Sequence, residues 1–176
     1  MKVSKKLERA DKGIVNRLER AIKNYNNQNE RFHFNESAKV LYDFVWNDFC
    51  DWYIEIAKTR FYSEDNDSKV STYNTCVKCI RIILPLLHPY TPFITEELWS
   101  YFKDKDQPDL IISSWPEQKS EFDLEIDNEM EILQGIISSV RAIRSRMNIP
   151  PSKKIELKVK CSDSQSDFIA NNSQFI

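Results

Sequence analysis

The first apolar stripe of the chain begins at Leu7 and has the spacing of an α-helix. Apolar residues recur three or four positions apart, at Leu7, Ala10, Ile14, Leu18, Ala21 and Tyr25. This period predicts a helix from Lys5 to Lys23 that buries one face. A row of basic residues falls on the opposite face. The polar stretch that follows, "NYNNQNERFHFN", predicts a turn.

The stretch "VWNDFCDWYIEIAK" has an apolar arc that is too broad for a surface helix. Asp48 and Glu55 fall inside this arc. A pair of carboxylates in apolar surroundings can perform acid–base chemistry, but no nucleophile, metal ligand or phosphate loop accompanies this pair. We therefore expect both to be buried structural carboxylates, because a buried charge needs a partner. The next helix offers three such partners, Lys78, Arg81 and His88.

Further helices follow the same periodic pattern. They are predicted from the N-cap Asn35 to about Arg60, over 68–87 with Pro85 near its end, from the pair Thr91 and Pro92 onward, and over about 123–147. After this last helix, Ile155, Leu157 and Val159 alternate with polar residues, which predicts a half-buried strand near 154–160. The fold class is therefore mainly α, a helix bundle with a small C-terminal α/β appendage.

Composition narrows the class of protein. The 176 residues carry a formal net charge of −2 and only two glycines, so neither a basic global field nor a glycine-rich phosphate loop is expected. No apolar run approaches the roughly 20 residues of a membrane span, and we expect no membrane partner. Four cysteines without a signal-peptide pattern favour the cytoplasm. Cys76 and Cys79 lie in mid-helix, so we expect buried thiols and no metal site.

Two groups of basic residues are candidates for RNA contact. The first is on the N-terminal helix and comprises Lys12, Arg17, Arg20 and Lys23. The second lies in "SVRAIRSRMNIPPSKK" and comprises Arg141, Arg144, Lys153 and Lys154. Guanidinium groups suit phosphates and stack on bases. Solvation of a helix face and stabilisation of a helix C-terminus are the structural alternatives.

Several strings resemble valyl-tRNA synthetases, in the order that this family shows. They are "NRLERAIKNYN", "FHFNESAKVLYDFVWNDFCDWYIEIAK", "LLHPYTPFITEELW", "SSWP" and "IRSRMNIPPSKKIEL", and the resemblance runs from about Leu7 to Val159. The matching region is the anticodon-binding helical bundle of class I aminoacyl-tRNA synthetases. The resemblance implies a bundle over 1–120 and a helix-plus-strand extension over 121–176 that is truncated at its C-terminus.

The resemblance also implies a function in protein biosynthesis. The parent enzyme would be a cytoplasmic valine–tRNA ligase that joins valine to its tRNA using ATP with magnesium. The His-x-Gly-His and Lys-Met-Ser-Lys-Ser signatures of the ATP site do not occur in this sequence. We therefore expect tRNA binding without catalysis, no catalytic residue, and no cofactor held by this chain. Apolar surface exposed by truncation suggests a homodimer as well.

Two alternatives remain at this point. The same module occurs in isoleucyl- and leucyl-tRNA synthetases, which share the "PFITEELW" region. A helical protein-interaction domain without RNA binding would also fit the bundle, although no exposed apolar groove is evident in the sequence.

Overall fold

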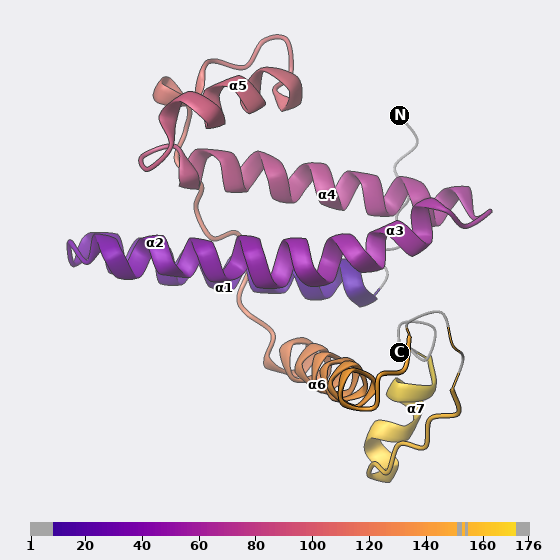
Figure 1. Cartoon of the computed structure of the whole chain (residues 1–176). Coiled ribbons are helices and arrows are strands. Elements are labelled where there is room, and N and C mark those ends of the chain that lie inside the picture. The colour runs from indigo at the N-terminus through magenta and orange to yellow at the C-terminus, as the bar shows by residue number, and fades with distance from the viewer. Residues whose placement is uncertain (1–8, 151–152, 154, 172–176) are drawn as a thin grey trace. The chain divides into compact units, whose positions relative to one another are not determined.

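A computed structural model describes residues 9–150, 153 and 155–171. The chain divides into two compact units, Met1–Asp123 and Leu124–Ile176, which are described separately. In the part of the chain that the structure describes, every regular element is a helix (Figure 1). The predicted mainly helical fold is therefore confirmed, whereas the strand is not present in the described residues.

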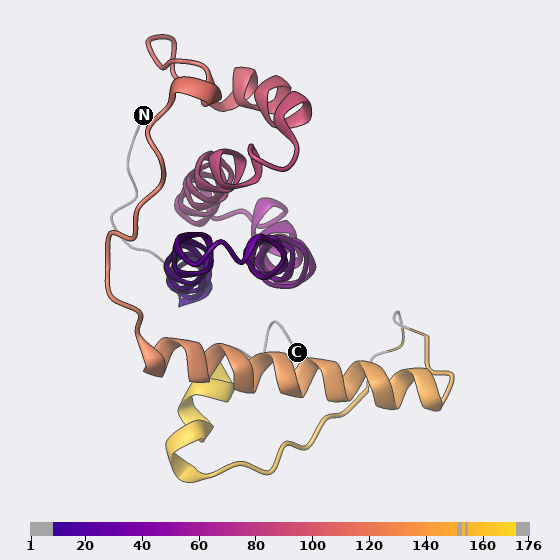
Figure 2. The same cartoon turned by 90° about the vertical axis from the view of Figure 1, so that its left-hand side faces the viewer.

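The first unit is a bundle of long helices. Its elements are α1 (Arg9–Glu30), α2 (Phe34–Asp43), η1 (Phe44–Ile54), α3 (Glu55–Phe61), α4 (Asn66–Leu87), α5 (Pro92–Phe102) and η2 (Leu110–Ile112). Figure 2 shows α1, the α2–α3 rod and α4 nearly end-on as a triangle, with α5 lying across α4. The apolar stripe of α1 faces the middle of this triangle, where Leu18, Ile22 and Leu41 are each 1% exposed.

Helix α1 is longer than the sequence predicts, because the asparagine-rich stretch is helical as far as Glu30. Tyr25 explains the extension. Its side chain is 1% exposed, its ring stacks on Trp115 at 5.7 Å, and Tyr90 meets it edge-on at 6.4 Å. This packing overrides the low helix propensity of asparagine. The predicted cap is also displaced, since His33 and not Asn35 occupies the N-cap of α2.

The predicted second helix contains a π-helical segment, η1, between α2 and α3. A π-helix forms i→i+5 hydrogen bonds and therefore has a wider turn than an α-helix. Phe44 and Phe49, five positions apart, are both buried in it. A helical wheel drawn at 100° per residue consequently misplaces side chains over and beyond this segment.

A buried polar cluster joins four elements of the bundle. Asp11 of α1 is 0% exposed and accepts hydrogen bonds from Tyr53 Oη at 2.7 Å, Arg60 Nη1 at 2.8 Å and Ser71 Oγ at 3.0 Å. These donors come from η1, α3 and α4. The carboxylate thus has several partners, as a buried charge requires.

An irregular segment, residues 113–123, is bonded along α1, and we call it the strap. Asn16 holds its end reciprocally, since Nδ2 donates to Asp123 O at 2.9 Å and Oδ1 accepts from Asp123 N at 2.8 Å. Glu19 accepts from Lys119 N at 2.8 Å. Trp115 Nε1 donates to Asn26 Oδ1 at 2.9 Å. The strap therefore covers the middle of the α1 surface.

The second unit contains α6 (Leu124–Arg146) and α7 (Asp163–Asn171). The predicted strand is wrong for residues 155–160, which form no regular element. Ile155, Leu157 and Val159 are 39, 42 and 37% exposed. Alternation favours a strand only where a neighbouring strand supplies the hydrogen bonds, and the described residues contain no strand.

Candidate nucleic-acid interface

The candidate basic group of α1 is only partly exposed. Lys12 and Lys23 are exposed, but Arg17 is 5% exposed and forms an ion pair with Asp48. Arg20 is half-buried and its guanidinium carbon lies 5.2 Å from the centre of the Phe122 ring, at the end of the strap. Arg17 therefore lies inside the bundle, and a phosphate would reach its guanidinium only if the pair with Asp48 opened.

The two carboxylates of the second helix differ from prediction and from each other. Asp48 is 19% exposed and forms an ion pair with Arg17 of α1. Glu55 is 51% exposed and pairs with Lys58, so the prediction of a buried Glu55 is wrong. The π-helical segment before Glu55 is the reason, because the wheel no longer holds there.

The three expected partners on the next helix lie elsewhere. Lys78 is exposed, Arg81 forms an ion pair with Asp104 at 2.8 Å, and the His88 ring nitrogen is 2.8 Å from Thr95 Oγ1. The Arg81 guanidinium lowers the pKa of the Asp104 carboxyl by its hydrogen bond. None of these three contacts reaches Asp48 or Glu55.

In the second unit, Arg144 closes the turn after α6. Its Nη2 donates to Pro150 O at 2.7 Å and to Lys153 O at 2.6 Å. Cations at this position also stabilise the helix C-terminus. Arg141 and Lys153 are exposed, whereas Lys154 lies outside the described residues. The structure thus brings Arg144 and Lys153 together, with Arg144 committed to backbone contacts.

A polar row does exist at the C-terminal end of α1 and in the turn after it. Lys23 and Asn27 of α1 and Arg31 of the turn succeed one another at four-residue intervals and are all exposed. Residues four apart are neighbours on a helix surface, so the row spans about 12 Å. Within residues 9–150 neither Lys23 nor Arg31 forms an ion pair, although Glu30 is exposed nearby. We call this row the basic end.

Two exposed aromatic residues adjoin the basic end, in the turn between α1 and α2. Phe32 is 78% exposed and Phe34 is 56% exposed. Their ring centroids are 6.2 Å apart and the ring planes meet at 81°. Neither residue is among the candidates predicted from the sequence, although two phenylalanines within the polar string "RFHFN" are a signal of exposed aromatic side chains.

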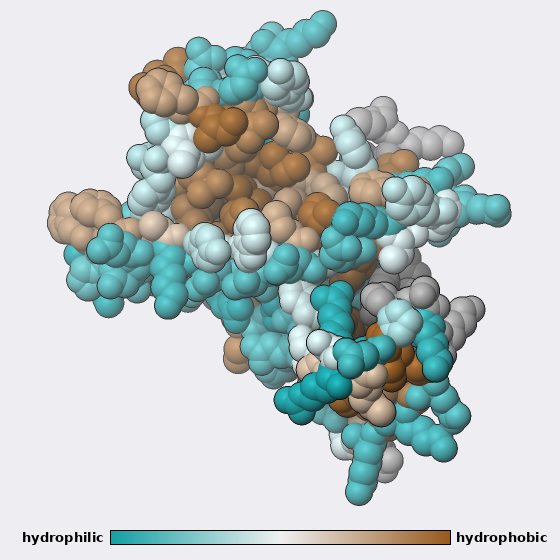
Figure 3. All heavy atoms as spheres, viewed as in Figure 1, coloured by the Kyte–Doolittle hydropathy of each residue, from teal (hydrophilic) through white to brown (hydrophobic). Residues whose placement is uncertain are grey.

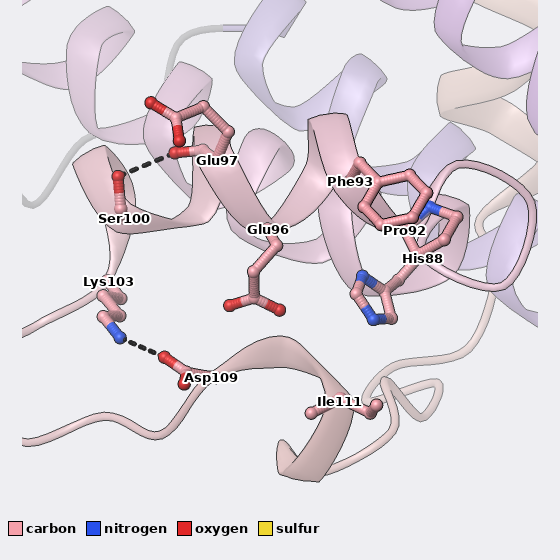
Figure 4. Close-up of a pocket in the computed structure, with 9 residues that line it drawn as sticks. All are labelled: His88, Pro92, Phe93, Glu96, Glu97, Ser100, Lys103, Asp109 and Ile111. Atoms are coloured by element: carbon pink, nitrogen blue, oxygen red, sulfur yellow. Dashed lines mark hydrogen bonds and ion pairs between the residues drawn. The ribbon is translucent and has the colours of Figure 1, made fainter.

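A separate pocket of about 590 Å³ lies between α5 and the segment that contains η2 (Figure 4). Its polar groups are engaged with one another: Glu96 accepts from Leu110 N at 3.1 Å, and Lys103 pairs with Asp109 at 2.7 Å. Three carboxylates, of Glu96, Glu97 and Asp109, line it. An acidic pocket repels phosphate, so the basic end is the better candidate for RNA.

The two mid-helix thiols are buried, as expected. Burial raises the pKa of Cys76 to about 11 and that of Cys79 to about 12, so both are protonated at neutral pH. Among the residues described here, no group of three or more His, Cys, Asp or Glu side chains is arranged to hold a metal ion. The described helices include none that is long and apolar enough to cross a membrane.

Comparisons with known proteins identify the domain. Residues 11–160 match the family model described as the anticodon-binding domain of tRNA ligase. The chain is 40% identical over 167 residues to the valine–tRNA ligase of Bacillus subtilis (strain 168), which covers 93% of this chain and 19% of that ligase. It is 37% identical over 171 residues to the valine–tRNA ligase of Listeria innocua, which covers 96% of this chain and 19% of that protein.

A third valine–tRNA ligase, from Bacillus cereus, is 37% identical over 155 residues, with 88% of this chain and 18% of the ligase covered. The chain therefore spans about a fifth of the length of the curated relatives that it matches. These matches confirm the resemblance noted in the sequence, and the chain belongs to the family of anticodon-binding domains of tRNA ligases.

Proposed function

We propose that this chain binds the anticodon arm of a valine-accepting tRNA on behalf of a valine–tRNA ligase. The family match over residues 11–160 carries the proposal, and the similarity to valine–tRNA ligases at 37–40% identity favours valine over isoleucine or leucine. The bundle, residues 1–120, would bind the RNA, and residues 121–176 would form an extension with Arg141 and Lys153 as additional phosphate contacts.

Binding would rest on neutralisation of phosphates by exposed cations. Lys23 and Arg31 lie about 12 Å apart along the row, far enough to contact different phosphates of one strand. Asn27 between them offers an amide that donates and accepts hydrogen bonds. Each lysine or arginine that meets a phosphate releases condensed counterions, so affinity falls as salt rises.

Chemistry on the amino acid belongs to the larger ligase in this proposal. The two ATP-site signatures do not occur in these residues, so ATP and magnesium would act on other parts of that enzyme. The cytoplasm, where translation takes place, is the compartment we assign to it.

The test is a salt titration of binding between this chain and a valine tRNA anticodon stem-loop. We expect a log–log slope equivalent to several phosphate contacts, and preference over isoleucine, leucine and scrambled loops. The charge reversal Lys23→Glu with Arg31→Glu should lower the slope by about one to two units. Lys78→Glu with Lys105→Glu changes the net charge equally at other exposed positions and should have little effect. Equal losses from both pairs would contradict a localised site.

Dimerisation remains a prediction as well. Figure 3 shows apolar side chains gathered between α5 and α4, and on α5 Ile94, Leu98 and Tyr101 are 56, 39 and 73% exposed. Contiguous apolar surface of this kind favours association. Light scattering during size exclusion would detect it as a mass twice 20.9 kDa.

A further inference from the structure

Phe32 occupies a backbone position at which glycine is the usual residue. Its φ is 58°, in the left-handed region. Phe32 N donates to Asn29 O at 2.9 Å, and His33 N donates to Gln28 O at 2.9 Å. This pair of bonds is the Schellman motif that closes helix α1, with Phe32 as the first residue beyond the cap. Left-handed φ is disfavoured for any residue that carries a β-carbon.

Burial does not compensate for this conformation. The Phe32 side chain is 78% exposed, so it contributes little buried apolar area to the fold. A glycine would form the same motif without strain. Strained backbone together with an exposed large ring therefore calls for an explanation outside the stability of the bundle.

The ring of Phe34 lies next to that of Phe32 and is exposed as well. The planes of Phe32 and Phe34 meet at 81° with centroids 6.2 Å apart, so the two rings form a right-angled corner. A planar group stacked on the face of one ring would meet the other ring at a right angle. Offset stacking and edge-to-face contact are the two arrangements that aromatic quadrupoles favour. Arg31 and His33, the neighbours of Phe32 in the sequence, are also exposed, and His33 Nδ1 lies 3.2 Å from Gln28 Oε1.

We propose that Phe32 and Phe34 form a stacking site for one unpaired nucleobase. Recognition of single-stranded RNA rests on stacking of splayed bases on aromatic side chains, with cations holding the adjoining phosphates. The basic end supplies two such cations, Lys23 of α1 and Arg31 of the turn that follows it. The inference rests on the proposed function, because it presumes that the bundle binds RNA.

A protein partner is the rival occupant. Protein interfaces bury on the order of 800 Å² per partner around an apolar centre, whereas this corner has two rings bordered by charged and amide side chains. The cationic border complements phosphate, which favours RNA.

The experiment uses the complete chain, a valine tRNA anticodon stem-loop and three variants. Phe32→Gly removes a ring and relieves the backbone, so it should unfold at a higher temperature yet bind RNA about tenfold more weakly. Phe34→Ala should weaken binding similarly. Phe93→Ala is the matched control, since Phe93, like Phe34, is in the first turn of a helix, and it is 91% exposed. It should leave affinity unchanged. The salt slope should stay constant in all three, because stacking releases no counterions.

A second readout locates the contact. Stem-loops with 5-iodouridine at each loop pyrimidine in turn should photocrosslink to Phe32 or Phe34 from one position. Unchanged affinity in both phenylalanine variants, while the unaltered chain binds, would overturn the stacking site and leave the proposed function intact. Failure of the unaltered chain to bind at low salt would overturn the proposed function, and the stacking site with it.

Discussion

Phe32 and Asp11 are both held against their intrinsic preferences, for opposite reasons. Phe32 is exposed in a conformation suited to glycine. Asp11 is a carboxylate with 0% exposure whose neighbours supply three hydrogen bonds. The fold does not need a phenylalanine at position 32. It does need the charge of Asp11, because three buried donors bond to that carboxylate.

Replacement of Phe32 by glycine should stabilise the chain. Left-handed backbone costs a residue with a β-carbon roughly 1–2 kcal/mol, and glycine loses about 0.5–1 kcal/mol of that advantage through its freer unfolded state. We expect a net gain of about 1 kcal/mol, measured by urea unfolding. Glu30→Gly, within the last turn of α1, is the control and should destabilise by about 0.5–1 kcal/mol. A loss of stability in Phe32→Gly would show that the ring contributes to the fold.

Replacement of Asp11 by alanine should destabilise strongly. The change leaves the Arg60 guanidinium, 6% exposed, without its carboxylate at 2.8 Å. Removal of one partner from a buried pair costs about 3–5 kcal/mol. Glu55→Ala removes one partner from the exposed pair with Lys58 and should cost at most about 1 kcal/mol. Similar unfolding midpoints for the two variants would contradict this account.

At the scale of elements, periodicity predicted the long helices because each buries one stripe. Helix α4 starts two residues before the predicted Ser68, where Asp65 caps it by accepting from the amides of Asp67 and Ser68. Helix α6 begins and ends within one residue of the predicted 123 and 147. The π-helix was not predictable, because its i→i+5 bonds depend on tertiary packing and leave no spacing rule in a mixed aromatic stretch.

The candidate site was predictable only in part. Lys12 and Lys23 are exposed as a wheel of α1 suggests, but Arg17 and Arg20 lie on positions that Asp48 and the strap cover. A helical wheel shows which residues share a face of one helix, but it does not show which distant segments of the chain cover that face. The two phenylalanines in "RFHFN" are visible in the sequence, but the left-handed backbone that makes Phe32 unusual is not.

The strap is the element whose attachment is most directly testable. Asn16→Ala removes both hydrogen bonds to Asp123, each worth about 1 kcal/mol. We expect faster amide hydrogen exchange at Lys119 and Asp123 while the amides of α4 stay protected. Asn24→Ala, on an exposed position of the same helix, is the control and should leave the strap unchanged. Uniform acceleration across the bundle would instead indicate global destabilisation.

For the molecule as a whole, alkaline pH should be destabilising. Burial raises the pKa of Tyr25 to about 12, of Cys76 to about 11 and of Cys79 to about 12, and it also raises the pKa of Tyr53. Each of these groups has a higher pKa in the folded chain than in the unfolded chain, where a thiol has a pKa of 9.0. Its contribution to stability is fully present below the pKa of the unfolded state and is lost as the pH rises toward the pKa of the folded state.

The free energy of unfolding should therefore decline from about pH 9 upward, by up to about 1.4 kcal/mol per pH unit for each group that ionises. Urea titrations between pH 7 and 11 would measure it. In Cys79→Ala the free energy of unfolding should decline less steeply, by up to about 1.4 kcal/mol per pH unit, because one ionising group is absent. A flat profile to pH 11 would contradict the assignment.

The bond between Asn16 and Asp123 has a consequence for the order of folding. It joins residues 107 positions apart, and closing so long a loop costs conformational entropy until other contacts bring the ends together. We therefore expect it to form after the intervening helices have assembled, on the native side of the transition state. Loss of this bond should consequently leave the refolding rate nearly unchanged and accelerate unfolding. The strap would then slow the unfolding of a bundle that assembles without it.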